Sequence, residues 1–227
     1  MVLIVHRIVS LLPLNVMSGL GTVTRSFVRF SLLQQNGFRI HELSPNVECI
    51  SFGSNLNFDL DELLNCKVIV YLHGGGFFLR DSVDLIIAER LLPLLKEQLT
   101  VTSKQTVIVS VLYPLSTQKS VQKDATSNNE IMLDFILKAM DLITERSSGI
   151  CAIVGDSAGG YLALQASKFH QNARLCLISP FLDLKMRSNS FERNKNTDFL
   201  DLKFLARCRN QFLSRGKIFS YEKMKSS

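Results

Sequence analysis

Ser157 stands in the pentapeptide Gly155-Asp156-Ser157-Ala158-Gly159, which fits the GxSxG pattern of a nucleophile elbow. In such a turn between a strand and a helix, small neighbours let the backbone bend tightly. The turn lifts the serine hydroxyl to the N-terminus of the helix, where the helix dipole favours negative charge. The same spacing also occurs in plain strand–helix turns in which a serine caps the helix, so the pattern alone leaves both interpretations open.

A second glycine-rich motif, His73-Gly74-Gly75-Gly76, directly follows the apolar run 67–72. Backbone N–H groups in such a loop can stabilise the negative oxygen of a tetrahedral intermediate, and each donor can contribute about 2.7–4 kcal/mol. Glycines serve here because side chains would block the approach of a substrate. The alternative is a flexible turn. Since both motifs follow buried strand candidates, in the order that this chemistry needs, chemistry at a carbonyl carbon is favoured.

The elements that must position these motifs alternate along the chain. Five short apolar runs predict strands, at 47–52, 67–72, 106–112, 150–154 and 173–179. Apolar residues at helical spacing predict helices at 84–99, 128–145, 157 to about 169, and 198–212. In the helix at 128–145, Ile131, Phe135, Ile136, Ala139 and Ile143 share a face. The alternation predicts an α/β protein with a mostly parallel sheet that helices cover on both faces.

The chain resembles the hormone-sensitive-lipase-like (GDXG) group of α/β-hydrolases, which includes arylacetamide deacetylases and fungal steryl acetyl hydrolases. The resemblance rests on YLHGGGFF (71–78), VGDSAGGYLAL (154–164) and LISPFLDL (177–184). It implies an α/β-hydrolase-type three-layer sandwich that hydrolyses acetyl or short-acyl esters of hydrophobic alcohols, without a metal or cofactor. By resemblance Ser157 is the nucleophile.

The resemblance also assigns the residues around the nucleophile. It implies an oxyanion hole at Gly74, Gly75, Gly76 and Ala158, with N–H groups from the last three and Gly74 shaping the loop. Four residues would support the site: His73, which braces the loop rather than acting as a base, with Gly155, Asp156 and Gly159.

The rest of a serine triad is missing from the expected places. In this fold the order is Ser, then Asp or Glu, then His, and the only histidine after Ser157 is His170. Thirteen helical residues would separate the two by roughly 20 Å. Asp183, Asp198 and Asp201 are available acids, but Asp183 belongs to the LISPFLDL motif, for which the resemblance implies a structural role. We therefore expect a sheet that lacks its last strands, and an apolar sheet edge left exposed.

Composition excludes several other classes of protein. Net charge is +6, but residues 184–227 hold 11 basic and 4 acidic residues, so the body is nearly neutral and the tail is basic. No nucleic-acid-binding module accompanies this charge, so we expect no nucleic-acid partner. Five widely spaced cysteines without a CxxC pair predict buried thiols rather than disulfides or a zinc site.

Three regions are expected. Residues 1–35 form an N-terminal segment, either a packed helix or a weak membrane anchor, residues 36–213 an incomplete α/β-hydrolase domain, and residues 214–227 a basic tail. An anchor would place the protein at the endoplasmic reticulum membrane, and otherwise it is expected in the cytoplasm. The partner is a small hydrophobic ester, and the oligomeric state is not encoded in any pattern.

Two functional hypotheses follow. In the first, the chain is an esterase-type hydrolase with a serine and an oxyanion hole but without the triad acid and histidine, so it has little or no activity alone. In the second, it is a non-catalytic module that binds a hydrophobic ligand or a protein.

Overall fold

The computed structural model describes residues 38–44, 47–52, 60–79, 106–116, 127–198 and 200–214. The N-terminal segment 1–35, the helix predicted at 84–99 and the basic tail beyond 214 lie outside these described residues. None of the helices in the described ranges is both long enough and apolar enough to cross a membrane.

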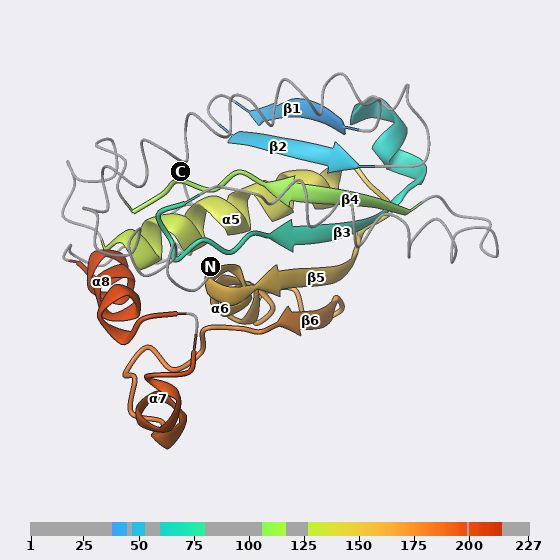
Figure 1. Ribbon diagram of the computed structural model, residues 1–227. Helices are drawn as coiled ribbons and strands as arrows, with labels where there is room; N and C mark the ends of the chain where they lie inside the picture. The colour runs from blue at the N-terminus through green and yellow to red at the C-terminus, as the bar shows by residue number, and fades with distance from the viewer. Residues whose placement is uncertain are drawn as a thin grey trace.

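The centre of the fold is a sheet in which the strands lie in the order β1-β2-β4-β3-β5-β6, visible edge to edge in Figure 1. β1 and β2 pair antiparallel, β2 pairs antiparallel with β4, and β4, β3, β5 and β6 run parallel. The strands are β1 (Phe38–Ser44), β2 (Val47–Phe52), β3 (Lys67–Leu72), β4 (Thr106–Val111), β5 (Ile150–Asp156) and β6 (Arg174–Ile178). All five predicted strands are confirmed, and β1 was not predicted.

β3 and β4 form the buried middle of the sheet. The successive residues Val70, Tyr71 and Leu72 of β3 have no exposed surface. In β4, the successive residues Val107 and Ile108 are at most 1% exposed. Strands covered on both faces need apolar residues at successive positions rather than in alternation, which is why these runs were recognisable in the sequence.

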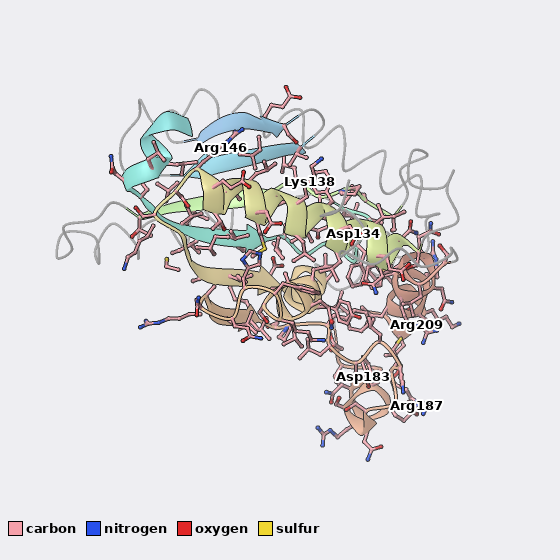
Figure 2. The ribbon with its side chains drawn as sticks, turned by 180° about the vertical axis from the view of Figure 1, so that it is seen from behind. Asp134, Lys138, Arg146, Asp183, Arg187 and Arg209 are labelled. Atoms are coloured by element: carbon pink, nitrogen blue, oxygen red, sulfur yellow. The ribbon has the colours of Figure 1, made fainter. Side chains whose placement is uncertain are left out.

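The helices are η1 (Leu60–Asn65, 3-10), α5 (Asn128–Glu145), α6 (Ser157–Ala166), α7 (Asn189–Asn194) and α8 (Leu202–Phe212). Helix α5 crosses the back of the sheet (Figure 2). It begins with a capping box, in which Ser127 and Glu130 satisfy each other's backbone N–H groups. Its buried face centres on Met132, Ile136, Ala139, Met140 and Ile143, whereas the predicted face residues Ile131 and Phe135 are only half-buried.

Two predicted helix boundaries were wrong. The helix that begins at Ser157 ends at Ala166 rather than near residue 169. The last helix begins at Leu202 rather than at Asp198, because the carboxylate of Asp201 accepts the N–H groups of Lys203 and Phe204 and so caps the helix there. Helix α7 was not predicted, and it buries no residue.

In the part of the chain that the structure describes, β6 is one of the two outer strands of the sheet, and β1 is the other. The apolar residues Leu175 and Ile178 of β6 are 37% and 38% exposed. Cys176 on the same strand is exposed as well. Of the other free cysteines, Cys66 and Cys208 are buried and Cys151 is half-buried. The prediction of an exposed apolar edge is therefore confirmed for the described residues, and the prediction of buried thiols fails at Cys176.

The predicted α/β architecture with a mostly parallel sheet is confirmed. Because β3 and β5 are parallel neighbours, their carboxyl ends meet at one edge, where Leu72 pairs with Gly155. The two glycine motifs follow these two ends directly, and the sheet therefore brings them side by side.

Candidate active site

Ser157 is the first residue of α6 and has a backbone φ of +50°. A side chain in this left-handed region costs conformational energy, of the order of 1–3 kcal/mol, so the surrounding structure must hold it there. Part of that support comes from the chain after β6, because the Phe181 N–H donates to the Ser157 carbonyl at 2.8 Å. The strained strand-to-helix turn expected of a nucleophile elbow is present.

The glycines of the elbow are explained by close approach of backbone. A Cβ on Gly159 would lie 2.1 Å from the Leu72 carbonyl oxygen and 2.3 Å from that of His73, and a Cβ on Gly155 would lie 2.4 Å from the Gly159 oxygen. A side chain at Gly159 would push the elbow away from the loop after β3, and one at Gly155 would collide with the first turns of α6. The two motifs are therefore packed directly against each other through their backbones.

The loop after β3 turns tightly at three successive residues. Gly75, Gly76 and Phe77 have φ values of +96°, +62° and +68°. The Gly75 carbonyl accepts N–H groups from Phe78 and Leu79 at 3.2 and 2.9 Å. Phe77 in this conformation is strained, because a bulky residue rarely has a positive φ. We call residues 73–78 the glycine loop.

Asp156 connects the glycine loop to the elbow. Its Oδ1 accepts the Gly74 N–H at 2.8 Å and the Tyr71 hydroxyl at 2.5 Å. Burial raises the pKa of the Asp156 carboxyl, and the hydrogen bonds from Tyr71 and Gly74 partly offset that effect. Because the Gly74 N–H is directed at Asp156, it is not available to an oxyanion, which leaves Gly74 the role of shaping the loop.

His73 is completely buried. Its ring stacks on Tyr113, with centroids 4.2 Å apart and planes 10° apart. Its Nδ1 lies 2.7 Å from the Gly74 carbonyl, to which it must donate, and the Tyr113 hydroxyl donates to the His73 carbonyl at 2.5 Å. These contacts fix the orientation of the His73 ring and of the His73 and Gly74 carbonyl groups.

Helix α8 covers the other side of the glycine loop. Phe77 stacks on Phe212, and Phe78 meets Phe204 edge to face. A Cβ on Gly76 would lie 3.0 Å from the Cys208 sulfur. Burial raises the pKa of the Cys208 thiol to about 12, so this cysteine stays protonated and acts as a packing residue.

The remaining histidine and acid candidates lie elsewhere. The Nε2 of His170 is 4.0 Å from Asp141 on α5, and His170 lines a cavity with Gly149 and Ile150 at the amino end of β5. Ser157 follows the carboxyl end of this seven-residue strand, which spans roughly 20 Å. His170 is therefore at the opposite end of the sheet from Ser157.

Asp183, Asp198 and Asp201 are each engaged with backbone N–H groups. Asp183 accepts those of Lys185, Arg187 and Ser188, and these hydrogen bonds, that from Ser188 first, lower the pKa of its carboxyl. Asp183 and Arg187 lie beside α7, away from the sheet (Figure 2). Asp198 accepts the Leu200 N–H, and Asp201 caps α8. All three acids organise local turns.

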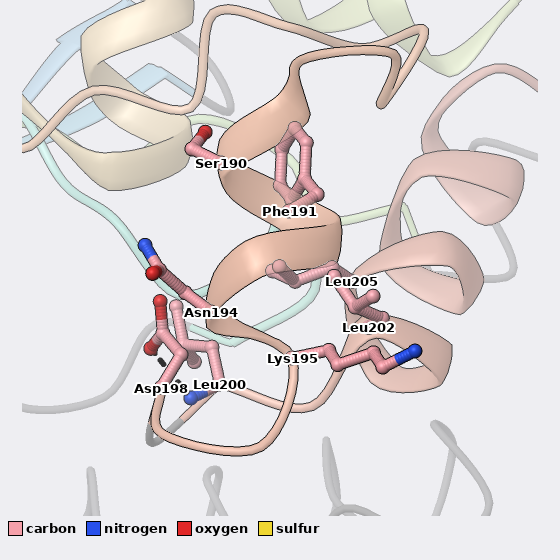
Figure 3. A pocket seen from close by; sticks show the side chains of 8 residues that line it. All are labelled: Ser190, Phe191, Asn194, Lys195, Asp198, Leu200, Leu202 and Leu205. Atoms are coloured by element: carbon pink, nitrogen blue, oxygen red, sulfur yellow. Dashed lines mark hydrogen bonds between the residues drawn. The ribbon is translucent and has the colours of Figure 1, made fainter.

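A cavity of about 90 Å³ lies between α7 and α8 (Figure 3). Its walls combine apolar side chains with Asn194, Lys195 and Asp198. No residue of the glycine loop or the elbow lines it, so it is separate from the candidate active site. The lining residues are Ser190, Phe191, Asn194, Lys195, Asp198, Leu200, Leu202 and Leu205.

Several residues that shape the site were not identified from the sequence: Tyr71, Tyr113, Cys208 and Phe212. Tyr71 falls inside the motif 71–78, but nothing in the motif shows where its hydroxyl points. Tyr113 follows the strand candidate 106–112, so its place near His73 would have followed from knowing that β4 neighbours β3. Cys208 and Phe212 lie 130 and 134 residues beyond the end of the glycine loop, and no local pattern links them to it.

Residues 69–222 match the model of a family described by its alpha/beta hydrolase fold. Among solved structures, one of two esterases from the fungus Rhizomucor miehei is similar, with 16% identity and a TM-score of 0.59 over 89% of this chain and 63% of that one. A thermostable esterase from Pseudomonas putida is similar with 16% identity and a TM-score of 0.59, over 91% and 62% of the two chains.

Brefeldin A esterase, described as a bacterial homologue of human hormone sensitive lipase, gives 14% identity and a TM-score of 0.53 over 77% of this chain and 50% of that one. This chain thus spans less than two thirds of the length of these esterases. No curated protein matches it. At such low identities the structural neighbours show the fold, and the matched family model covers most of the chain. The protein belongs to the alpha/beta hydrolase fold family.

Proposed function

We propose that this chain carries the nucleophile and the oxyanion-binding half of a carboxylic-ester hydrolase site. Ser157 is the nucleophile, and the N–H groups of Gly75, Gly76 and Ala158 receive the oxyanion. The substrates are acetyl or short-acyl esters of hydrophobic alcohols, as the resemblance to arylacetamide deacetylases and steryl acetyl hydrolases implies.

One observation carries this proposal: Ser157 has a left-handed backbone at the start of α6, while the elbow glycine Gly159 lies against the carbonyls that open the glycine loop. A plain turn with a serine cap needs neither the strain nor the close approach. Ser157 lies at the helix N-terminus, where developing negative charge is favoured, and the close approach of Gly159 supports the glycine N–H groups of the neighbouring loop as the oxyanion donors.

Attack by serine forms a bond between its Oγ and the carbonyl carbon, and the hydroxyl proton must go to a base. His170 is held near Asp141 at the far end of the sheet, and His73 is fixed in a stack with Tyr113. We therefore propose little turnover by these 227 residues alone, with residual acceleration of roughly 10³–10⁴-fold over water from binding and the oxyanion hole. For turnover, a base other than His73 and His170 would have to accept the Ser157 proton.

The site itself is tested without turnover. A small alkylboronic acid adds to a serine Oγ, the hydroxyl proton leaves to the buffer, and boron becomes a tetrahedral anion that needs oxyanion donors. We expect a tetrahedral ¹¹B NMR signal with the wild-type chain and none with Ser157→Ala. Equal spectra for the two proteins would contradict the assignment of Ser157.

Turnover is a separate measurement, made with p-nitrophenyl acetate. We expect a rate that exceeds the Ser157→Ala background only slightly. Fast hydrolysis that Ser157→Ala abolishes would support Ser157 as the nucleophile but overturn the proposal of low activity.

The alternative, a non-catalytic module, is favoured by the exposed apolar residues Leu175, Ile178 and Leu182 on and after β6, which a protein partner would cover. The two functions differ in whether Ser157 reacts. A boronate adduct that Ser157→Ala abolishes supports the ester site, whereas a module that only binds a partner forms no adduct in either protein.

A further inference from the structure

We propose that Asp156 is a positioning residue that ties the oxyanion-binding loop to the nucleophile elbow. The inference rests on the proposed function, because it concerns how the donors of that site are held in place. It assigns a role to the one charged residue inside the elbow, next to the nucleophile.

The first argument is the contact that Asp156 does not make. Asp156 occupies the N-cap position of α6, and an aspartate there ordinarily accepts a backbone N–H of the first helical turn. The side chain of Asp156 makes no such cap. By contrast, Asp201 at the N-cap of α8 accepts two backbone N–H groups of its own helix. Asp156 thus gives up a favourable local contact, which indicates that its carboxylate is used elsewhere.

The second argument is the contact that Asp156 does make. Both hydrogen bonds to its Oδ1 come from the β3 side, from the Tyr71 hydroxyl and the Gly74 N–H, more than 80 residues earlier in the chain. Gly74 immediately precedes the loop donors Gly75 and Gly76. The Asp156 backbone continues directly into Ser157. One carboxylate oxygen therefore connects the residue before the nucleophile to the residue before the donors.

The third argument is steric. A Cβ on Gly74 would lie 2.3 Å from the Asp156 Oδ2, so the two residues fit only because position 74 lacks a side chain. A shorter residue at 156 would relieve this crowding, and burial raises the pKa of the carboxyl. A buried carboxylate costs stability unless hydrogen bonds compensate. The hydrogen bonds from Tyr71 and Gly74 provide this compensation and at the same time tie Asp156 to the loop.

The experiment measures n-butylboronic acid affinity in wild type, Asp156→Ala, Asp156→Asn and Tyr71→Phe, with Asp141→Ala as the matched control at the far end of the sheet. The amide of Asp156→Asn keeps an oxygen that can accept both hydrogen bonds. We expect Asp156→Ala to weaken binding about 10- to 100-fold, since small displacements of an oriented group have effects of this size. Asp156→Asn should restore affinity to within roughly threefold of wild type, because the acceptor remains.

Tyr71→Phe removes one of the two donors and should weaken binding less than Asp156→Ala, while Asp141→Ala should leave it unchanged. Equal affinities for wild type and a folded Asp156→Ala would overturn the positioning role, and so would an Asp156→Asn that binds as weakly as Asp156→Ala. A purely structural role would lower thermal stability without this rescue pattern.

A second measurement separates this inference from the proposed function. Amide hydrogen exchange at Gly74 reports the tether directly, with no ligand present. We expect protection in wild type and in Asp156→Asn, and faster exchange in Tyr71→Phe and Asp156→Ala. If no wild-type boronate adduct forms, the proposed function fails while the exchange data still decide the tether. Fast Gly74 exchange in the wild type would overturn the tether whatever the boronate result.

Discussion

The ring of Phe77 lies parallel to that of Phe212, with centroids 3.7 Å apart and an angle of 11° between their planes. Phe77 belongs to the glycine loop and has a positive φ, and Phe212 is the last residue of α8. Tyr161 of α6 meets the Phe212 ring edge to face as well. A helix from the far end of the chain therefore holds both the loop and the helix that begins at the nucleophile.

Phe212→Ala should lower the free energy of unfolding by about 3–5 kcal/mol, as truncation of a buried aromatic ring does. Phe212 has no exposed surface, whereas its neighbour Leu213 is 47% exposed. Leu213→Ala is the matched control and should change stability by less than about 0.5 kcal/mol. Urea unfolding followed by circular dichroism measures both. Similar losses for the two variants would contradict the role given to the Phe77–Phe212 stack.

Gly159→Ala should disrupt the contact between the elbow and the loop after β3, because its new Cβ would fall 2.1 Å from the Leu72 carbonyl oxygen. Gly149→Ala is the comparison. Gly149 has a φ of +101°, but nothing lies within 4 Å of its added Cβ, so only backbone strain of about 1–2 kcal/mol is expected there. In thermal melts, Gly159→Ala should lose more stability than Gly149→Ala and should also lose the boronate adduct. The reverse order would exclude close packing as the reason for Gly159.

Two aspartates should give opposite pH dependences of stability. The pKa of Asp156 is raised in the folded chain, mainly by burial, so its contribution is fully present below the ordinary aspartate pKa and is lost as pH rises through the raised value. Because asparagine does not ionise, Asp156→Asn does not lose this contribution to stability as pH rises. Relative to wild type, it should therefore become more stable as pH rises from the ordinary aspartate pKa through the raised one.

The pKa of Asp183 is shifted in the opposite direction, so its effect on stability has the opposite pH dependence. Backbone hydrogen bonds, that from Ser188 first, lower its pKa, so its contribution is present above the ordinary aspartate pKa and is lost as pH falls through the lowered value. Asp183→Asn should be less stable than wild type at neutral pH, with the difference shrinking in acid. Urea midpoints across acidic and neutral pH test both aspartates, and parallel curves for the two variants would refute the assignment.

Ile178→Lys should reduce aggregation without a large loss of stability, because Ile178 is 38% exposed on an outer strand of the described sheet. A charge on an edge strand discourages pairing with other chains. Ile153→Lys on β5 is the control, since Ile153 is fully buried and a lysine there should prevent folding. Light scattering at matched concentration measures the effect. Unchanged aggregation of Ile178→Lys would argue against β6 as the sheet edge through which chains aggregate.

The fold class and the position of the candidate site could both be predicted from the amino-acid sequence. Both were readable because the signals are local. The continuous apolar runs at β3 and β4 mark strands buried on both faces, and the glycines around Ser157 and after His73 mark backbone that tolerates no side chain. The capping residues refine this local information, and the structure corrected the start of α8 from Asp198 to Leu202 through the Asp201 cap.

The contacts of each site residue, by contrast, depend on how distant segments of the chain pack together. That Asp156 binds Gly74 and Tyr71 rather than its own helix, that Tyr113 stacks on His73, and that Phe212 stacks on Phe77 all depend on the placement of β3 between β4 and β5 and of α8 beside the loop. These contacts join residues 40 to 135 positions apart, and no periodicity or motif within one segment encodes them. The same placement separates His170 from Ser157, because the helix after the nucleophile returns the chain to the opposite end of the sheet.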